Sequence, residues 1–208
     1  MDMMAIRRRM LMASKKRLPS AYQEVEYIES TGTQYIKTNY IPQKFDSIKC
    51  LFSMSEFYTS KSTHWTLFSA GTDTHQLIVL LAKDDVDGAY YKYFARGDAP
   101  RFNFYPNINI KYEINIDSNG IISCNNYTAQ SRYQGAVDTP LYLMERANKS
   151  SPFKGKIYNF IISNNEINVL HLIPCYRKSD GEIGMYDTVA KTFLTNQGTG
   201  TFLKGADV

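Results

Sequence analysis

The feature that most limits the fold of this chain is a succession of short alternating segments separated by turn residues. The clearest example is 111–124, in which two alternating apolar runs flank Asn119-Gly120. Asn-Gly is the dipeptide that best supplies the two positive-φ positions of a tight hairpin turn. No helical periodicity follows residue 20, and strands that recur with turns about every 8–12 residues are typical of a sandwich or barrel. The sequence therefore predicts an all-β fold.

The basic charge of the chain is confined to its N-terminus. The net charge is +4, but six basic residues against Asp2 give +5 within residues 1–17, so the other 191 residues sum to −1. The body therefore offers no bulk attraction for nucleic acid. The apolar run between the two basic clusters is too short for a signal peptide, and no segment reaches the roughly 18 apolar residues of a membrane span.

The cysteines and histidines indicate no cofactor. Cys50, Cys124 and Cys175 lack the close spacing of a zinc or redox motif, so reduced thiols are predicted, with Cys175 as a small buried apolar residue. The three histidines are scattered, without the paired spacing of metal ligands or a catalytic triad. No glycine-rich phosphate loop is present.

A set of short motifs runs in order through the chain: Leu18-Pro19-Ser20, Val25–Ile36, Pro140–Leu143, Gly155–Tyr158, Leu172–Cys175, Gly184–Asp187 and Gly198–Phe202. Together they resemble the laminin-G/concanavalin A-like jelly-roll domains found in bacteriophage virion proteins and gut-bacterial surface proteins. The resemblance implies a two-sheet antiparallel jelly-roll sandwich over residues 18–208, with the first and last strands adjacent, preceded by a basic arm over 1–17. It implies no single activity, because this fold carries lectins, glucanases and assembly modules.

The basic arm is predicted to form a short helix with one apolar stripe. Three interpretations are open: binding to nucleic-acid phosphates, binding to anionic lipid, and docking onto a partner protein. Docking explains the arginines and the methionines together, because Met makes adaptable apolar contacts and Arg forms interface pairs. The residues expected to anchor the arm are Met3, Ile6, Arg7, Arg8, Arg9, Met10, Lys15, Lys16 and Arg17.

The densest aromatic stretch of the chain supplies the candidate ligand-binding residues. Tyrosine faces next to arginine suit sugar stacking or a protein interface. Alternating aromatic residues on adjacent strands also fill a sandwich core, so the two interpretations stand side by side. The candidates are Tyr90, Tyr91, Tyr93, Arg96, Arg101 and Tyr105. Trp65 is expected in the core.

Two groups of carboxylates are weaker candidates. Asp84, Asp85 and Asp87 can supply the oxygen ligands of calcium, which related laminin-G-like domains hold at a sandwich rim, although Asp-Gly is equally a turn signal. The run 24–29 places Glu24, Glu26 and Glu29 near the pattern of laminarinase-type glucanases of this fold. Retaining hydrolysis needs two carboxyl groups about 5–5.5 Å apart. A glutamate replaces the central Asp of that pattern and the run lies on the first strand, so catalysis is not predicted.

The function expected from the sequence is that of a non-enzymatic structural protein on a bacteriophage particle. It would decorate the capsid head or the tail, and its synthesis would take place in the host bacterial cytoplasm. Its expected partners are other virion proteins, bound through the arm, together with host surface polysaccharide and further copies of the chain; nucleic acid is not expected. The alternatives are a bacterial cell-surface carbohydrate-binding module and, less favoured, a laminarinase-type glycoside hydrolase.

Overall fold

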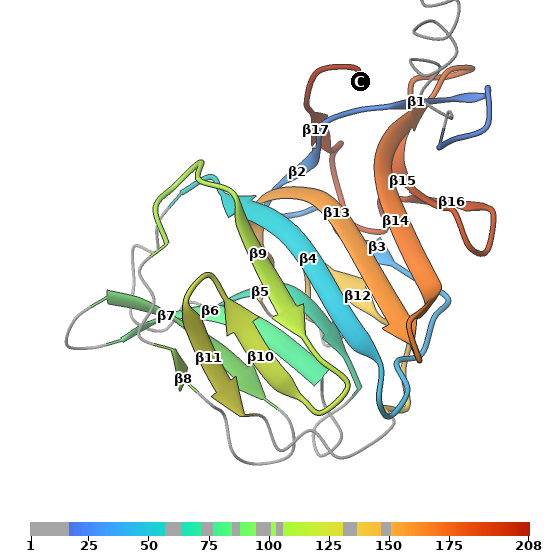
Figure 1. The fold of residues 1–208 in the computed structure, drawn as a ribbon. Coiled ribbons are helices and arrows are strands. Elements are labelled where there is room, and N and C mark those ends of the chain that lie inside the picture. Colours follow the sequence, from blue (N-terminus) through green and yellow to red (C-terminus); the bar gives the residue numbers. More distant parts are fainter. Residues whose placement is uncertain are drawn as a thin grey trace, which may run out of the picture.

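The computed structural model describes residues 17–56, 64–71, 77–84, 88–94, 101–102, 106–130, 137–146 and 151–208 (Figure 1). These residues form β-strands and no helix. The strands are β1 (Tyr22–Glu24), β2 (Ile28–Thr31), β3 (Ile36–Lys37), β4 (Ser47–Met54), β5 (His64–Ala70), β6 (Leu77–Asp84), β7 (Gly88–Phe94), β8 (Arg101–Phe102), β9 (Tyr112–Ile116), β10 (Ile121–Cys124), β11 (Tyr127–Gln130), β12 (Tyr142–Leu143), β13 (Lys154–Asn164), β14 (Ile167–Arg177), β15 (Ile183–Asp187), β16 (Thr192–Thr195) and β17 (Leu203–Lys204).

The strands make two antiparallel sheets. The larger sheet has the order β11-β10-β9-β4-β13-β14-β15-β16, and β1, β2 and β17 join it beside β13 and β14. The smaller sheet has the order β3-β12-β5-β6-β7-β8. Figure 1 shows β9, β4 and β13 side by side in front of β5, β6 and β12. The predicted two-sheet sandwich is confirmed.

The core lies between the two sheets, because the side chains along the strands of the larger sheet alternate between buried and exposed positions. In β9, Tyr112, Ile114 and Ile116 are buried while the residues between them are more exposed. Phe160 of β13 is fully buried and meets Phe68 of β5 edge to face, with ring centroids 5.2 Å apart. Full burial of one such side chain stabilises a fold by about 1.5–3 kcal/mol. Trp65 also lies in this core, as predicted.

Strands β13 and β14 begin as one hairpin and then diverge. Near the turn they pair with each other, from Asn164 opposite Ile167 to Phe160 opposite Leu172. Further along, the same edge of β13 pairs with β2, and the same edge of β14 pairs with β1. The opening between the two strands is thus filled by the first strands of the body (Figure 1).

The last residues of the chain complete this region. Strand β17 pairs with β2, Val25 forms an isolated bridge with Asp207, and the Val208 amide donates to the Glu24 carbonyl at 3.0 Å. The expected neighbourhood of the first and last strands is therefore confirmed. A small second core covers the adjacent outer surface of β14 and β15, where Leu18 packs with Ile173, Cys175 and Tyr186. Cys175 is fully buried, as predicted.

The turn between β9 and β10 differs from the one predicted. A hairpin is present, but in the Asn119-Gly120 pair only Gly120 has a positive φ, of 79°. The Gly120 amide donates to the Asp117 carbonyl at 3.0 Å, and the Asp117 carboxylate accepts from the amides of Asn119 and Ile121. The loop is thus longer than two residues, with Gly120 in the left-handed position of a bulged turn. The Asp117 side chain favours this form because it satisfies the turn amides directly.

Candidate functional site

Polar and aromatic side chains gather on the outer face of the larger sheet, the face turned away from the smaller sheet. The burial pattern of β13 explains why these side chains lie on the outer face. Gly155, Ile157 and Phe160 are buried, whereas Lys156 and Tyr158 are partly exposed. The pairing of β13 with β4 shifts between Ile157 and Asn159, and this bulge interrupts the regular alternation next to Tyr158. Bulges of this kind redirect side chains and are over-represented beside functional sites.

Four residues from three segments form what we call the tyrosine–lysine face: Tyr27, which precedes β2, Lys111, which precedes β9, and Lys156 and Tyr158 of β13. The two tyrosine rings meet edge to face, with centroids 5.4 Å apart and an interplanar angle of 68°. Lys156 Nζ lies 4.7 Å from the Tyr27 ring centroid, and Lys111 Nζ lies 4.3 Å from the Tyr158 ring centroid. Both distances fall within the range of cation–π attraction.

The polar groups around this face hold it in place. The hydroxyls of Tyr158 and Ser53 are hydrogen-bonded at 3.1 Å. Lys156 Nζ donates to Asn109 Oδ1 at 3.3 Å. Beside them, the Ser55 hydroxyl donates to the carboxylate of Glu29. The face therefore presents hydroxyl, amide and ammonium groups around two aromatic rings, which is the mixture that recognises polar ligands carrying apolar surface.

Gly205 makes room for the Tyr27 ring. The Gly205 amide donates to the Tyr27 carbonyl at 3.0 Å, so β17 lies close against this residue. A Cβ atom at position 205 would lie 2.9 Å from two carbons of the Tyr27 ring and 2.8 Å from the Cβ of Glu26. Only glycine allows this approach without a shift of the neighbouring side chains.

Neither lysine of the face forms an ion pair with a carboxylate among the residues that the structure describes. Among the described residues, the ion pairs are Arg17–Glu24, Lys154–Glu56, Arg177–Asp180 and Lys204–Asp207. Glu29 lies opposite Lys156 in the strand register, but the carboxylate of Glu29 accepts from Ser55. Lys111 and Lys156 are thus positioned by aromatic rings, and Lys156 also by the amide of Asn109.

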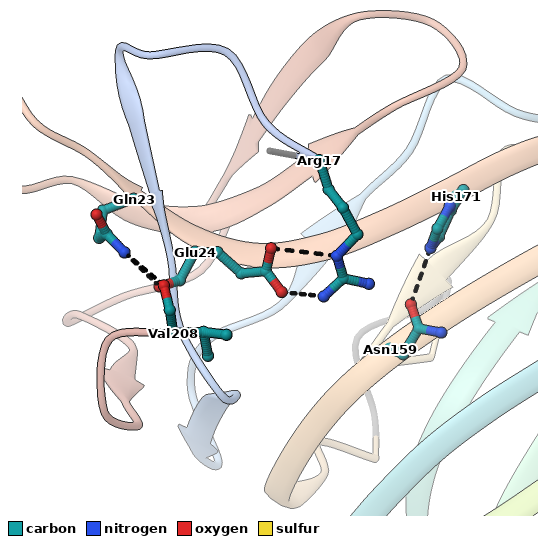
Figure 2. Close-up of polar contacts among 6 residues, drawn as sticks. All are labelled: Arg17, Gln23, Glu24, Asn159, His171 and Val208. Carbon is teal, nitrogen blue, oxygen red and sulfur yellow. Dashed lines mark hydrogen bonds and ion pairs between the residues drawn. The ribbon is translucent and has the colours of Figure 1, made fainter. Parts of the chain in front are cut away.

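A second polar region lies where β13 and β14 diverge (Figure 2). The Arg17 guanidinium forms a two-pronged pair with the Glu24 carboxylate, and Gln23 Nε2 donates to the Val208 carbonyl at 3.0 Å. Nearby, a 3.2 Å hydrogen bond joins His171 Nε2 and Asn159 Oδ1. Burial and then the nearby Arg17 charge lower the pKa of His171 below its usual 6.5.

Of the sequence-predicted aromatic candidates, three lie in β7, where Tyr90, Tyr91 and Tyr93 are opposite Ala82, Leu81 and Val79 of β6. Arg101 begins β8 and pairs with Lys92 of β7. Arg96 and Tyr105 lie outside the described residues. The backbone thus brings Tyr90, Tyr91, Tyr93 and Arg101 together in the smaller sheet, away from the tyrosine–lysine face.

The carboxylate candidates are separated. Asp84 ends β6 opposite Gly88, while Asp85 and Asp87 lie outside the described residues. Within the described part of the chain, no group of three or more His, Cys, Asp or Glu side chains is arranged to hold a metal ion. Of the three glutamates in the glucanase-like run, Glu24 belongs to β1, Glu29 belongs to β2 and Glu26 lies between the two strands. Glu24 and Glu29 have different partners.

The arm residues Met3, Ile6, Arg7, Arg8, Arg9, Met10, Lys15 and Lys16 lie outside the described residues. Arg17, the last residue predicted to anchor the arm to a partner, pairs with Glu24 of the body instead of standing free. None of the described residues forms a helix with the length and apolarity that a membrane crossing requires.

Sequence reasoning did not identify the tyrosine–lysine face. Tyr27 and Tyr158 both fall within the family-like motifs, yet nothing in either motif indicates that the two residues meet. A usable signal was present at the start of β13, where Lys154, Lys156 and Tyr158 alternate with Gly155 and Ile157 and with Phe153 just before the strand. That alternation predicts an outer face rich in lysine and tyrosine. The partner Tyr27 follows only from the pairing of β13 with β2.

Comparison with solved structures identifies the fold. The chain is similar to a crystal structure described as a "putative carbohydrate binding protein" from Bacteroides ovatus, with a TM-score of 0.58 and 14% identity over 89% of this chain; the match spans 62% of that protein. It is also similar to the heptameric SAP-like pentraxin of Limulus polyphemus, with a TM-score of 0.53 and 6% identity over 88% of this chain and 94% of the pentraxin. No family model and no curated protein sequence matches the chain. The chain is therefore an all-β, concanavalin A-like jelly-roll sandwich, as predicted.

Proposed function

We propose that this chain is a carbohydrate-binding module that holds its ligand on the tyrosine–lysine face. The observation that carries the proposal is the meeting of Tyr27 and Tyr158 on a sheet surface, surrounded by hydroxyl and amide groups. Aromatic side chains supply the contact area for the apolar faces of sugars, and the hydroxyl and amide groups match the sugar hydroxyls. The similarity to a protein described as carbohydrate-binding supports the same class.

A glycan array followed by titration calorimetry tests this proposal. The chain should bind a defined set of saccharides, and Tyr27→Ala and Tyr158→Ala should each weaken that binding at least about tenfold. Tyr142→Ala is the matched control, because Tyr142 also lies under a lysine, with Lys37 Nζ 5.8 Å from its ring centroid, but on the smaller sheet. Equal losses in all three variants, or no saccharide binding at all, would refute the proposal.

The module is proposed to act by binding alone. Glu24 of β1 is paired with Arg17, whereas Glu29 of β2 accepts a hydrogen bond from Ser55. The two carboxylates therefore interact with different partners on different strands. The chain should therefore release no reducing sugar from laminarin or mixed-linkage glucans. Measured turnover that disappears in Glu29→Gln would establish a glycosidase and overturn this part of the proposal.

The finer assignment, to the head or tail of a bacteriophage particle, is proposed from the sequence alone. It depends on the basic arm as an anchor to other virion proteins. Deleting residues 2–17 should abolish incorporation into particles while leaving the circular dichroism spectrum and the melting temperature of the body close to those of the full chain. Normal incorporation of the truncated chain would show that the arm is not the anchor.

A further inference from the structure

We propose that the saccharide bound at the tyrosine–lysine face carries negative charge, as a uronic acid or a sulfated sugar does. This inference rests on the proposed function and narrows it to one class of ligand. It follows from the arrangement of the two lysines relative to the two rings, and from the charges that surround them.

The faces of both rings are already approached by ammonium groups. Lys156 Nζ lies 4.7 Å from the centre of Tyr27, and Lys111 Nζ lies 4.3 Å from the centre of Tyr158. A neutral sugar that stacks on either ring from this side has to displace the lysine and loses its attraction to the ring. That loss corresponds to about two- to fivefold in affinity for each ring. An acidic sugar offsets this loss, because it gains a charge-assisted contact with the lysines.

The lysines are also held ready for an anion. The rings of Tyr27 and Tyr158 touch edge to face, so the two ammonium groups that lie over them belong to one continuous surface. Lys156 is further restrained by its hydrogen bond to Asn109 Oδ1. Binding groups restrained before the ligand arrives lose less conformational entropy on binding, so more of the interaction appears as affinity.

The described carboxylates near the face do not form ion pairs with its lysines. Glu56 pairs with Lys154, and Glu29 accepts from Ser55. Among the described residues, neither Lys111 nor Lys156 forms an ion pair. The ammonium groups of Lys111 and Lys156 are therefore not engaged by a described carboxylate, so both can contact an incoming carboxylate or sulfate.

Ligand pairs that differ only in charge test the proposal. Calorimetry with galacturonate oligosaccharides and their methyl esters compares a carboxylate with its neutral ester, and sulfated dextran with plain dextran does the same for sulfate. At least one charged ligand should bind about tenfold or more tightly than its neutral form, and its affinity should fall as sodium chloride rises from 50 to 300 mM. The ligand pair in which the charged form binds more tightly shows whether carboxylate or sulfate is recognised.

Single lysine variants of the full chain locate the effect. Lys111→Gln and Lys156→Gln should each weaken binding of the charged ligand about tenfold, as expected for one charged hydrogen bond. Lys37→Gln is the control, since it removes the same charge from a lysine above Tyr142. All three lysines lie outside the core, so unchanged melting temperatures are expected to show that the variants are folded.

The outcomes separate this inference from the proposed function. Binding of neutral saccharides that depends on Tyr27 and Tyr158 but not on the lysines would refute the charge preference and leave the carbohydrate-binding function standing. An equal loss in Lys37→Gln would show general attraction of a polyanion and would also refute the inference. Failure of every saccharide, charged or neutral, to bind would refute the proposed function itself.

Discussion

Replacing Phe160 by alanine tests whether the two sheets pack face to face through their aromatic side chains. Phe160 is fully buried and contacts Phe68 of the opposite sheet, with ring centroids 5.2 Å apart and an interplanar angle of 77°. Truncation of a buried Phe costs about 3–5 kcal/mol of unfolding free energy, from lost transfer energy and the cavity that remains. The edge-to-face contact accounts for about 0.5–1.5 kcal/mol of coupling with Phe68.

Urea denaturation followed by tryptophan fluorescence measures this cost. A loss of about 4 kcal/mol with an m-value of about 2.5 kcal/mol/M lowers the midpoint by about 1.5 M. Because natural domains are stable by only about 5–15 kcal/mol, Phe160→Leu serves as a milder variant, with an expected loss below about 1.5 kcal/mol. Phe45→Ala is the control, because Phe45 is 56% exposed and should lose less than about 1 kcal/mol. A loss in Phe160→Ala no greater than in Phe45→Ala would refute the packing described above.

Three further predictions concern the site and the response to pH. Gly205→Ala should displace the Tyr27 ring and weaken saccharide binding, measured by calorimetry, while the chain remains folded; unchanged affinity would mean that the ring position is unimportant. Burial raises the pKa of Cys175 to about 12, so the folded state retains this proton and loses stability as pH rises above about 9; urea titrations at pH 8–11 should show a shallower decline for Cys175→Ala, by up to about 1.4 kcal/mol per pH unit. The lowered pKa of His171 means that stability falls as pH drops below about 6.5, and Arg17→Gln should raise this pKa in an NMR titration of the imidazole.

The sequence contains enough information for the fold because its signals are local. The alternation of apolar and polar residues in 111–124, and the turn between the two runs, can each be recognised within a few residues. The structure forms β9 and β10 there. The exact turn was not predictable from Asn119-Gly120, because the outcome depends on whether Asp117 caps the turn amides. Strand order cannot be predicted from such local signals. The divergence of β13 and β14, for example, depends on pairing with the distant strands β2 and β1.

The candidate site was less predictable because it depends on contacts between distant segments. Composition directs attention to the densest aromatic stretch, whose backbone the structure places in the smaller sheet. The tyrosine–lysine face instead combines single aromatic residues from two strands, and each is unremarkable in its own segment. Tyr27 meets Tyr158 only because β2 pairs with β13 and Gly205 leaves space for the ring.

The filling of the opening between β13 and β14 has a consequence for biosynthesis. Strand β2 is synthesised well before its partners β13 and β17, which begin at residues 154 and 203. Phe202, which is buried in the core, is also synthesised after β13. The nascent polypeptide thus carries an unpaired strand edge until β13 and β17 have been synthesised, and contacts this distant in sequence form slowly.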